Sequence, residues 1–322
     1  MATVLFLNHK IKNCGVYQYG QRIIDILIKD SEINYIYKEI DSYQEYCHIL
    51  NENNNIYAII YNYHASTMSW LTPTNIQRNV KNVGIPHESP EYLFDIICNI
   101  DPDAPESSNR FSLPRPIYEN VEDIIQSSLS TQTPTNDNIN TFINNYTDTN
   151  IPIFGSFGFG FDNKGFDKIV DMINKQYDSA IIKFVIPIAH FDPNPNTVDN
   201  MRNKCINANK KPGIILMIIH AFFSTEDILR FLKSNTMNIF LYDEMHGRGI
   251  SSTIDYAISV KTPLGISDSY MFRNIYSDEI CLYKNTIEYC LKNSVDYCST
   301  FLKKYGHDSL IKKFKNILSF SR

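Results

Sequence analysis

Short apolar runs alternate with segments of helical spacing along nearly the whole chain, and this alternation restricts the fold more than any other feature of the sequence. The run at 3–8, TVLFLN, is continuously apolar, as strands are when a parallel sheet buries both of their faces. The segment at 21–30 then brings its aliphatic residues to one helical face (Ile23, Ile24, Leu27 and Ile28). Because strands separated by helices pair in parallel, the pattern predicts an α/β fold.

The alternation is interrupted once and then restarts, which predicts two domains. Residues 119–150 are rich in Asn, Thr and Ser and poor in large aliphatic residues. The length of 322 residues also exceeds the usual size of a single hydrophobic core. We therefore predict two Rossmann-like, doubly wound domains, 1–148 and 149–322, that face a cleft and bind ligands outside the carboxyl ends of their strands.

Composition argues against several classes of protein. The net charge of −5 is unfavourable for bulk binding to nucleic acid. The seven cysteines are scattered and never form a C-x-x-C pair, so we expect neither a disulfide framework nor a zinc site, and a reducing, cytoplasmic location. The N-terminus has the pattern of a strand rather than a signal peptide, and the longest apolar stretch, 213–223, is too short to span a bilayer.

Four glycines fall within eleven residues at 155–165, between an apolar strand and a helix. A chain that passes from a strand through glycines into a helix presents backbone N–H groups to a phosphate, and Lys164 adds a cation to the same turn. The dinucleotide fingerprint fails here because residue 163 is Asn, and the Walker A motif fails because Gly165 is not followed by Lys and Ser or Thr. The turn is therefore predicted to bind another phosphate-containing ligand, with a ligand-free glycine turn as the alternative.

A second glycine-bearing turn, at 247–252, follows a predicted strand and opens a helix. Backbone N–H groups and the dipole at a helix start favour a bound diphosphate, whose charge Arg248 and Lys164 are predicted to neutralise. Asp255 is predicted to accept hydrogen bonds from the hydroxyls of a ribose, with a solvated helix residue as the alternative. The amides expected to contact the diphosphate belong to four consecutive residues (Gly249, Ile250, Ser251 and Ser252).

In these segments the chain resembles the retaining glycosyltransferases of family 4 (group 1), which have two Rossmann-like domains, the GT-B architecture. Lys164 and Gly165 match the Lys–Gly of the family's donor-binding turn. Asp255 stands where the family has its ribose-binding Glu, after a glycine-rich segment. The family's glycine loop after the first strand is matched by the segment around Gly15. The order of elements agrees over the whole chain, and these three segments carry the similarity of motifs.

The resemblance implies an enzyme that transfers a sugar from a nucleotide-diphosphate-sugar donor to an acceptor. It also implies retention of anomeric configuration, with no metal and no cofactor. The backbone of Gly15 and Val16 is expected to approach the donor phosphates. His87, at a strand end, and Glu244 are expected to contact the sugar as candidate catalytic residues. The acceptor, whether a glycan, a lipid-linked molecule or another compound, is left open.

Departures from the family pattern keep other functions open. Ser156 stands at the position of a phosphate-binding Arg, Gly247 at that of a conserved-motif Glu, and Asp255 is one carbon shorter than the ribose-binding Glu. A sugar-nucleotide epimerase or phosphorylase of the same architecture is one alternative. A non-catalytic binding protein with this fold is the other.

Two further segments allow additional contacts. Asp101 and Asp103 form a D-x-D pair, which binds a metal-chelated sugar nucleotide in single-domain glycosyltransferases, although the intervening Pro102 favours a turn. The segment 301–322 places basic residues among Leu and Phe, which allows peripheral contact with an anionic membrane. In the architecture that the chain resembles, a C-terminal helix more often packs back across both domains, and we expect that arrangement here.

Overall fold

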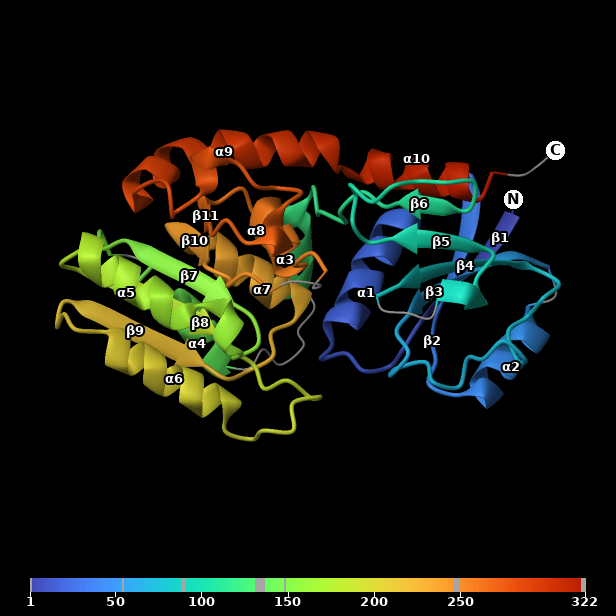
Figure 1. Cartoon of the computed structure of the whole chain (residues 1–322), viewed down its shortest axis with the longest axis horizontal. Coiled ribbons are helices and arrows are strands. Elements are labelled where there is room, and N and C mark those ends of the chain that lie inside the picture. Colours follow the sequence, from blue (N-terminus) through green and yellow to red (C-terminus); the bar gives the residue numbers. More distant parts are fainter. Residues whose placement is uncertain are drawn as a thin grey trace. The chain divides into compact units, whose positions relative to one another are not determined.

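Two compact units make up the chain. Unit 1 comprises Met1–Ile117 and Lys304–Arg322, and unit 2 comprises Tyr118–Lys303. Each unit is built on its own sheet of parallel strands, on which helices pack (Figure 1). The predicted α/β class with two Rossmann-like sheets is therefore confirmed. The computed structural model describes residues 2–53, 55–87, 91–130, 137–147, 149–245 and 249–319.

The described part of unit 1 contains a six-stranded sheet in the order β2-β1-β3-β4-β5-β6, with every neighbouring pair parallel. Its strands are β1 (Ala2–Asn8), β2 (Ile33–Glu39), β3 (Ile56–Tyr63), β4 (Lys81–Pro86), β5 (Ile96–Asn99) and β6 (Arg110–Ser112). Its helices are α1 (Gly15–Leu27), α2 (Tyr43–Glu52) and α10 (His307–Ile317). The strand order reverses between β1 and β3, the position where ligands bind in sheets of this kind.

Both faces of the unit 1 sheet are covered, which explains its continuously apolar strands. Val4 and Phe6 of β1 lie in one apolar layer, together with residues of α1 and α10. Leu5 and Leu7 point to the opposite face and lie in a second layer, together with residues of α2. Successive side chains of a strand alternate between faces, so a strand that is buried on both sides needs an apolar residue at every position.

The prediction for the apolar face of α1 is wrong at one residue. Ile23, Ile24 and Leu27 are buried as expected, but Ile28 is 60% exposed. The helix ends at Leu27, and Ile28 is its C-cap. Ile26 is buried within α1.

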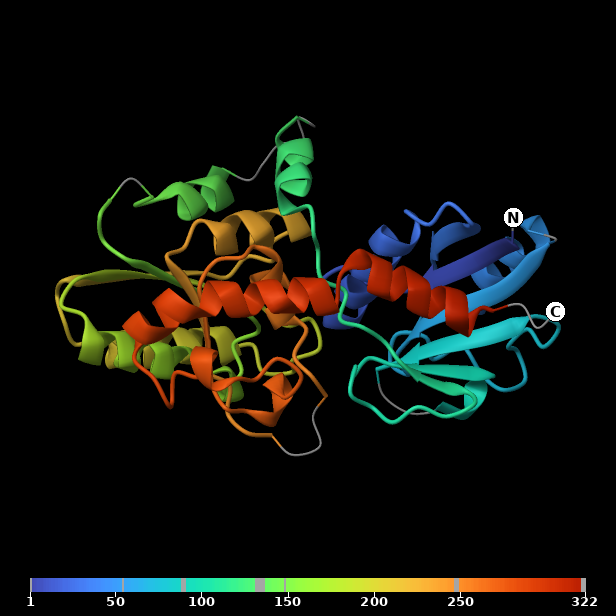
Figure 2. The ribbon, with the colours of Figure 1, turned by 90° about the horizontal axis from the view of Figure 1, so that it is seen from above.

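The C-terminal helix α10 packs within unit 1. Figure 2 shows it, in red, over the strands of this unit, and its apolar residues are buried in the layer that contains α1 (Leu310, Phe314 and Ile317). Lys313 forms an ion pair with Glu106, and Lys315 lies 3.1 Å from Asp30. The apolar face is thus used inside the unit, and the membrane contact considered for this helix stays a prediction. Among the described residues, no helix has both the length and the apolar character that a membrane crossing needs.

The described part of unit 2 contains a five-stranded parallel sheet in the order β11-β10-β7-β8-β9. Its strands are β7 (Ile153–Phe157), β8 (Ala180–Val185), β9 (Ile214–Ile219), β10 (Met237–Phe240) and β11 (Leu264–Ile266). Its helices are α3 (Val121–Ser130), α4 (Asp137–Asn144), α5 (Phe166–Gln176), α6 (Thr197–Ala208), α7 (Thr225–Lys233), α8 (Thr253–Ser259) and α9 (Ile287–Lys304), the last of which ends one residue beyond the unit.

The polar segment that precedes β7 belongs to unit 2, whereas the sequence placed the domain boundary at 148. The backbone N–H of Tyr118 donates to the hydroxyl of Ser259 at 3.0 Å. Ile139, Phe142 and Ile143 of α4 are all buried. A short helix needs only these few apolar residues to dock, so the composition of the segment resembles that of a linker.

Lys183 holds the end of α4 against β8. Its side chain is fully buried, and its ammonium donates to the carbonyl oxygens of Ile143, at 2.9 Å, and Asn145. Burial lowers the pKa of Lys183 to about 8. The unfolded chain, in which the pKa is near the ordinary value of about 10.5, therefore binds more protons than the folded chain between those two pH values. The stability penalty of the buried charge shrinks as pH rises through this window.

We expect Lys183→Met to change the pH dependence of stability. In urea unfolding between pH 8 and 10.5, the free energy of unfolding of the wild type should gain about 2 kcal/mol relative to the variant. Ile181→Met is the matched control, because Ile181 is buried two positions earlier in β8 and carries no titratable group. If the free energies of unfolding of the wild type and Lys183→Met changed equally with pH, the lowered pKa of Lys183 would be contradicted.

Candidate functional site

A network of buried polar side chains lies at the carboxyl ends of β1 and β3. Asn8 and Asn62 are both fully buried, and Asn62 Nδ2 donates to Asn8 Oδ1 at 2.9 Å. Asn62 Nδ2 also donates to the carbonyl of Val16 at 2.7 Å, and Asn8 Nδ2 donates to that of Tyr17 at 3.0 Å. An unpaired amide here would be costly, so the two asparagines fix the first turn of α1 relative to the sheet.

Glycine is required inside this network but not at the helix start. A Cβ on Gly20 would lie 2.4 Å from Asn62 Nδ2, so α1 approaches the asparagine closely only because Gly20 has no side chain. A Cβ on Gly15 would meet no atom within 4 Å, and Gly15 is exposed. Packing alone therefore does not explain Gly15, whose backbone is open to a ligand.

The same network fixes His87, which follows β4. Because Asn62 donates through Nδ2, its Oδ1 is an acceptor, and His87 Nε2 donates to it at 2.8 Å. Burial of the ring and, to a smaller extent, His64, His9 and Arg22 lower the pKa of His87 to about 3. The ring is therefore neutral at physiological pH, with its proton on Nε2 and a lone pair on Nδ1. His87 can accept a hydrogen bond from a hydroxyl, but its low basicity is unfavourable for proton abstraction.

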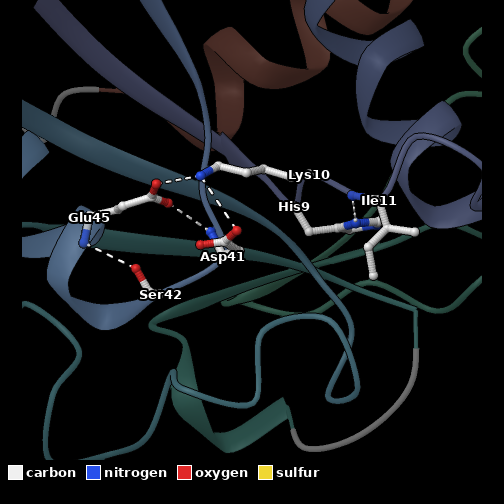
Figure 3. Close-up of polar contacts among 6 residues, drawn as sticks. All are labelled: His9, Lys10, Ile11, Asp41, Ser42 and Glu45. Carbon is white, nitrogen blue, oxygen red and sulfur yellow. Dashed lines mark hydrogen bonds and ion pairs between the residues drawn. The ribbon is translucent and has the colours of Figure 1, made fainter.

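Ion pairs and a local hydrogen bond hold the loop between β1 and α1 (Figure 3). The ammonium of Lys10 forms ion pairs with Asp41, at 3.5 Å, and with Glu45 at the start of α2. His9 is buried, and its Nδ1 accepts the backbone N–H of Ile11 at 3.1 Å. The loop that leads to α1 is thus tied to the start of α2 by Lys10 and stabilised within itself by His9.

In unit 2, the glycine turn after β7 packs against the chain that leaves β10. Gly165 has a left-handed backbone, with φ of 63°, and a Cβ there would lie 2.0 Å from the carbonyl oxygen of Leu241. The backbone N–H of Asp243 donates to the carbonyl of Asn163 at 2.9 Å. The turn is therefore held directly beside the carboxyl end of β10, and only glycine at 165 permits this approach.

Lys164 and the start of α8 meet at Tyr242. The ammonium of Lys164 lies 3.8 Å from the centroid of the buried Tyr242 ring, in cation–π geometry. The hydroxyl of Tyr242 is 2.9 Å from that of Thr253, which in turn is 2.7 Å from the hydroxyl of Ser251. The structure thus brings the two glycine-bearing turns of the sequence to one place in unit 2.

Three further predicted site residues have the following surroundings. Asp255, in α8, is buried with 1% exposure, so in this conformation its carboxylate is not open to a ribose. The backbone N–H of Ser251 donates to the carbonyl of Met271 at 3.0 Å, so this amide already has an acceptor. The exposed Glu244 accepts the backbone N–H of Tyr270 at 2.7 Å.

The residues that carry the other predicted phosphate-binding amides are more exposed than Ser251. Gly249 is exposed, and Ile250 and Ser252 are partly buried. Arg248 and Gly247 lie outside the described residues.

Sequence reasoning missed the residues that order the polar network of unit 1 and the glycine-bearing turns of unit 2. Asn8 and Asn62 are polar residues near the ends of apolar strands, a signal that the sequence does contain. Tyr242 and Thr253 carry no such signal, since Tyr242 is one more aromatic residue in a strand-like run.

The D-x-D pair lies in a turn. The backbone N–H of Asp103 donates to the carboxylate of Asp101 at 3.1 Å. Within the described ranges, no three or more His, Cys, Asp or Glu side chains are grouped so that they could hold a metal ion.

Comparison with protein-family models and with curated protein sequences finds no match. Solved structures do match, over nearly the whole chain. A glycosyltransferase from Rickettsia africae has a TM-score of 0.67 at 13% identity, covering 99% of both chains. HepE from Anabaena, in complex with UDP and glucose, has a TM-score of 0.66 at 9% identity, covering 99% of this chain and 100% of HepE.

A UDP-forming trehalose-phosphate synthase from Burkholderia xenovorans has a TM-score of 0.58 at 8% identity, covering 99% of both chains. At such identities the likeness shows the fold, which these glycosyltransferases share with the chain: the GT-B architecture.

We expect His87 to stay neutral far below the pH at which an ordinary histidine titrates, near 6.5. Its ring signals in ¹⁵N NMR should keep the pattern of the Nε2–H tautomer down to about pH 4.5, because burial lowers its pKa to about 3. Asn62→Asp replaces the amide acceptor with a carboxylate and should raise this pKa. Titration of wild-type His87 between pH 6 and 7 would contradict the proposed network.

Proposed function

We propose that the protein is a glycosyltransferase that uses a nucleotide-diphosphate sugar as donor, without a metal or cofactor and with retention of configuration. The observation that carries the proposal is the meeting of the Lys164 turn with the Tyr242–Thr253 contact, at the carboxyl ends of β7 and β10. The fold, shared with glycosyltransferases whose structures contain UDP, supports the same assignment. The acceptor is a hydroxyl compound, whether a glycan, a lipid-linked molecule or another compound.

We propose that Lys164 binds the donor diphosphate. Within the described ranges its ammonium forms no ion pair, and the Tyr242 ring occupies only one side of it. An ammonium has three N–H donors, and those that do not face the Tyr242 ring are available to phosphate oxygens. As the bond between the sugar carbon and the diphosphate breaks, negative charge develops on the diphosphate, and a fixed cation stabilises it.

The backbone around the second turn completes this proposal. Because the N–H of Ser251 has an acceptor in Met271, we assign the phosphate contacts to the amides of Gly249, Ile250 and Ser252. Arg248 is retained as a second phosphate-binding cation. Asp255 is retained as the ribose ligand, and its burial requires that neighbouring groups shift when the donor binds.

In unit 1 we propose that the backbone of Gly15 and Val16 approaches the donor phosphates and that His87 contacts the sugar. A neutral ring with its proton held by Asn62 presents only Nδ1, which accepts a hydrogen bond from a sugar hydroxyl. His87 thus orients the sugar rather than removing a proton. Glu244 is exposed, with one oxygen engaged by Tyr270, and its contact with the sugar stays a proposal.

A non-catalytic nucleotide-sugar-binding protein is the second candidate function. Ser156, which stands where the resembled family has a phosphate-binding Arg, is 1% exposed in β7 and supplies no cation. Release of nucleotide diphosphate from the sugar nucleotide only when an acceptor is added would establish transfer. Binding without any release, over a panel of acceptors, would favour the second candidate. Conversion of the sugar nucleotide without an acceptor would favour an epimerase.

We expect UDP to bind, and Lys164→Met to weaken that binding by about tenfold to a hundredfold, because a charge-assisted hydrogen bond to phosphate is lost. Isothermal titration calorimetry measures both affinities. Lys175→Met is the matched control, since Lys175 lies at the far end of α5 in an exposed pair with Asp171. Equal UDP affinities for the wild type and Lys164→Met would contradict the assignment of Lys164. No binding of UDP, GDP or ADP at millimolar concentration would contradict the proposed function.

A further inference from the structure

One side chain, Tyr242, contacts Lys164 of the glycine turn and the start of α8, and lies near Gly158 at the other end of the turn. A Cβ placed on Gly158, at the beginning of the turn, would lie 3.6 Å from the Tyr242 hydroxyl. Lys164, near the end of the turn, lies over the face of the same ring. The Tyr242 hydroxyl forms a hydrogen bond with the hydroxyl of Thr253, the first residue of α8. Tyr242 is therefore the physical link between two segments that are far apart in the sequence.

The position of Tyr242 is itself fixed from several sides. The side chain is 2% exposed, and its ring packs on that of Phe272, with centroids 4.9 Å apart. Its backbone carbonyl accepts the hydroxyl of Ser267 at 2.7 Å. A buried ring held in this way has one orientation. The positions that it offers to Lys164, on its face, and to Thr253, at its hydroxyl, are therefore fixed as well.

The two contacts of Tyr242 act by different physics. The ring face attracts the Lys164 ammonium through its quadrupole and orders a long, flexible side chain before any ligand arrives. The hydroxyl fixes Thr253 and, through it, Ser251 by hydrogen bonds. Preordering both groups lowers the entropy lost when a diphosphate binds between them.

We propose that Tyr242 is a positioning residue, which sets the Lys164 ammonium through its ring and the 251–253 segment through its hydroxyl for a nucleoside diphosphate. The inference rests on the proposed function, because it concerns the same ligand. It assigns to Tyr242 two separable contributions to binding, neither of which requires Tyr242 to touch the ligand.

The contact between Lys164 and the ring is tested without ligand. After reductive methylation with ¹³C-formaldehyde, the methyl protons of Lys164 should resonate upfield of an unshielded dimethyl-lysine, because they lie over a ring face. The signal is assigned by its loss in Lys164→Met. It should persist in Tyr242→Phe and lose its upfield shift in Tyr242→Leu. Phe157→Leu, which removes a neighbouring ring that packs on Phe240, is the control and should leave the shift in place.

The two contributions to binding are separated by coupled substitutions, with UDP affinity measured by calorimetry. Tyr242→Leu should bind UDP about fivefold more weakly than Tyr242→Phe, and this difference should vanish when Lys164 is Met. Tyr242→Phe should bind about fivefold more weakly than the wild type, and this difference should vanish when Thr253 is Val. A merely structural role would give the same losses in every background.

The outcomes distinguish this inference from the function on which it rests. Absence of UDP binding to the wild type would overturn both. Normal UDP binding that depends on Lys164, together with an unshifted Lys164 signal or with equal losses in the Lys164→Met background, would overturn the role of Tyr242 alone. An upfield signal together with both couplings would support it.

Discussion

The left-handed backbone at Gly165 is the constraint on which the candidate donor site depends. No other residue fits there, because a Cβ would lie 2.0 Å from the carbonyl oxygen of Leu241. The close approach brings Lys164 over Tyr242, and Tyr242 reaches Thr253 at the start of α8. A single glycine thus allows a turn after β7 and the chain after β10 to meet at the carboxyl edge of the sheet.

In unit 1, buried amides rather than a glycine turn fix the candidate site residues. Asn8 and Asn62 have no exposure, and each amide uses its donors on the network, including the backbone of the first turn of α1. The orientation of Asn62 in turn determines which nitrogen of His87 carries the proton. Buried polar groups are costly unless they are paired, so such a network specifies one arrangement of its members.

The sequence was sufficient for the fold class and for the glycine turn with Lys164, because periodicity and glycine spacing are local signals. It was insufficient where the outcome depends on packing. Asp255 has the spacing of a ligand-binding residue, but its burial is decided by the surroundings of α8. The role of Tyr242 follows from the approach of Lys164 and Thr253, neither of which is near it in the sequence. Ile28 was predicted to lie on the buried face of α1, but it follows the last helical residue and is exposed.

The central claim is that the turns at 158–165 and 249–253 bind one diphosphate together. A crystal structure of the protein with UDP tests it most directly. The account predicts a phosphate oxygen within hydrogen-bond distance of Lys164 Nζ, and another that accepts backbone N–H groups from Gly249, Ile250 or Ser252. A diphosphate bound elsewhere, or one that contacts only one of these turns, would contradict the account.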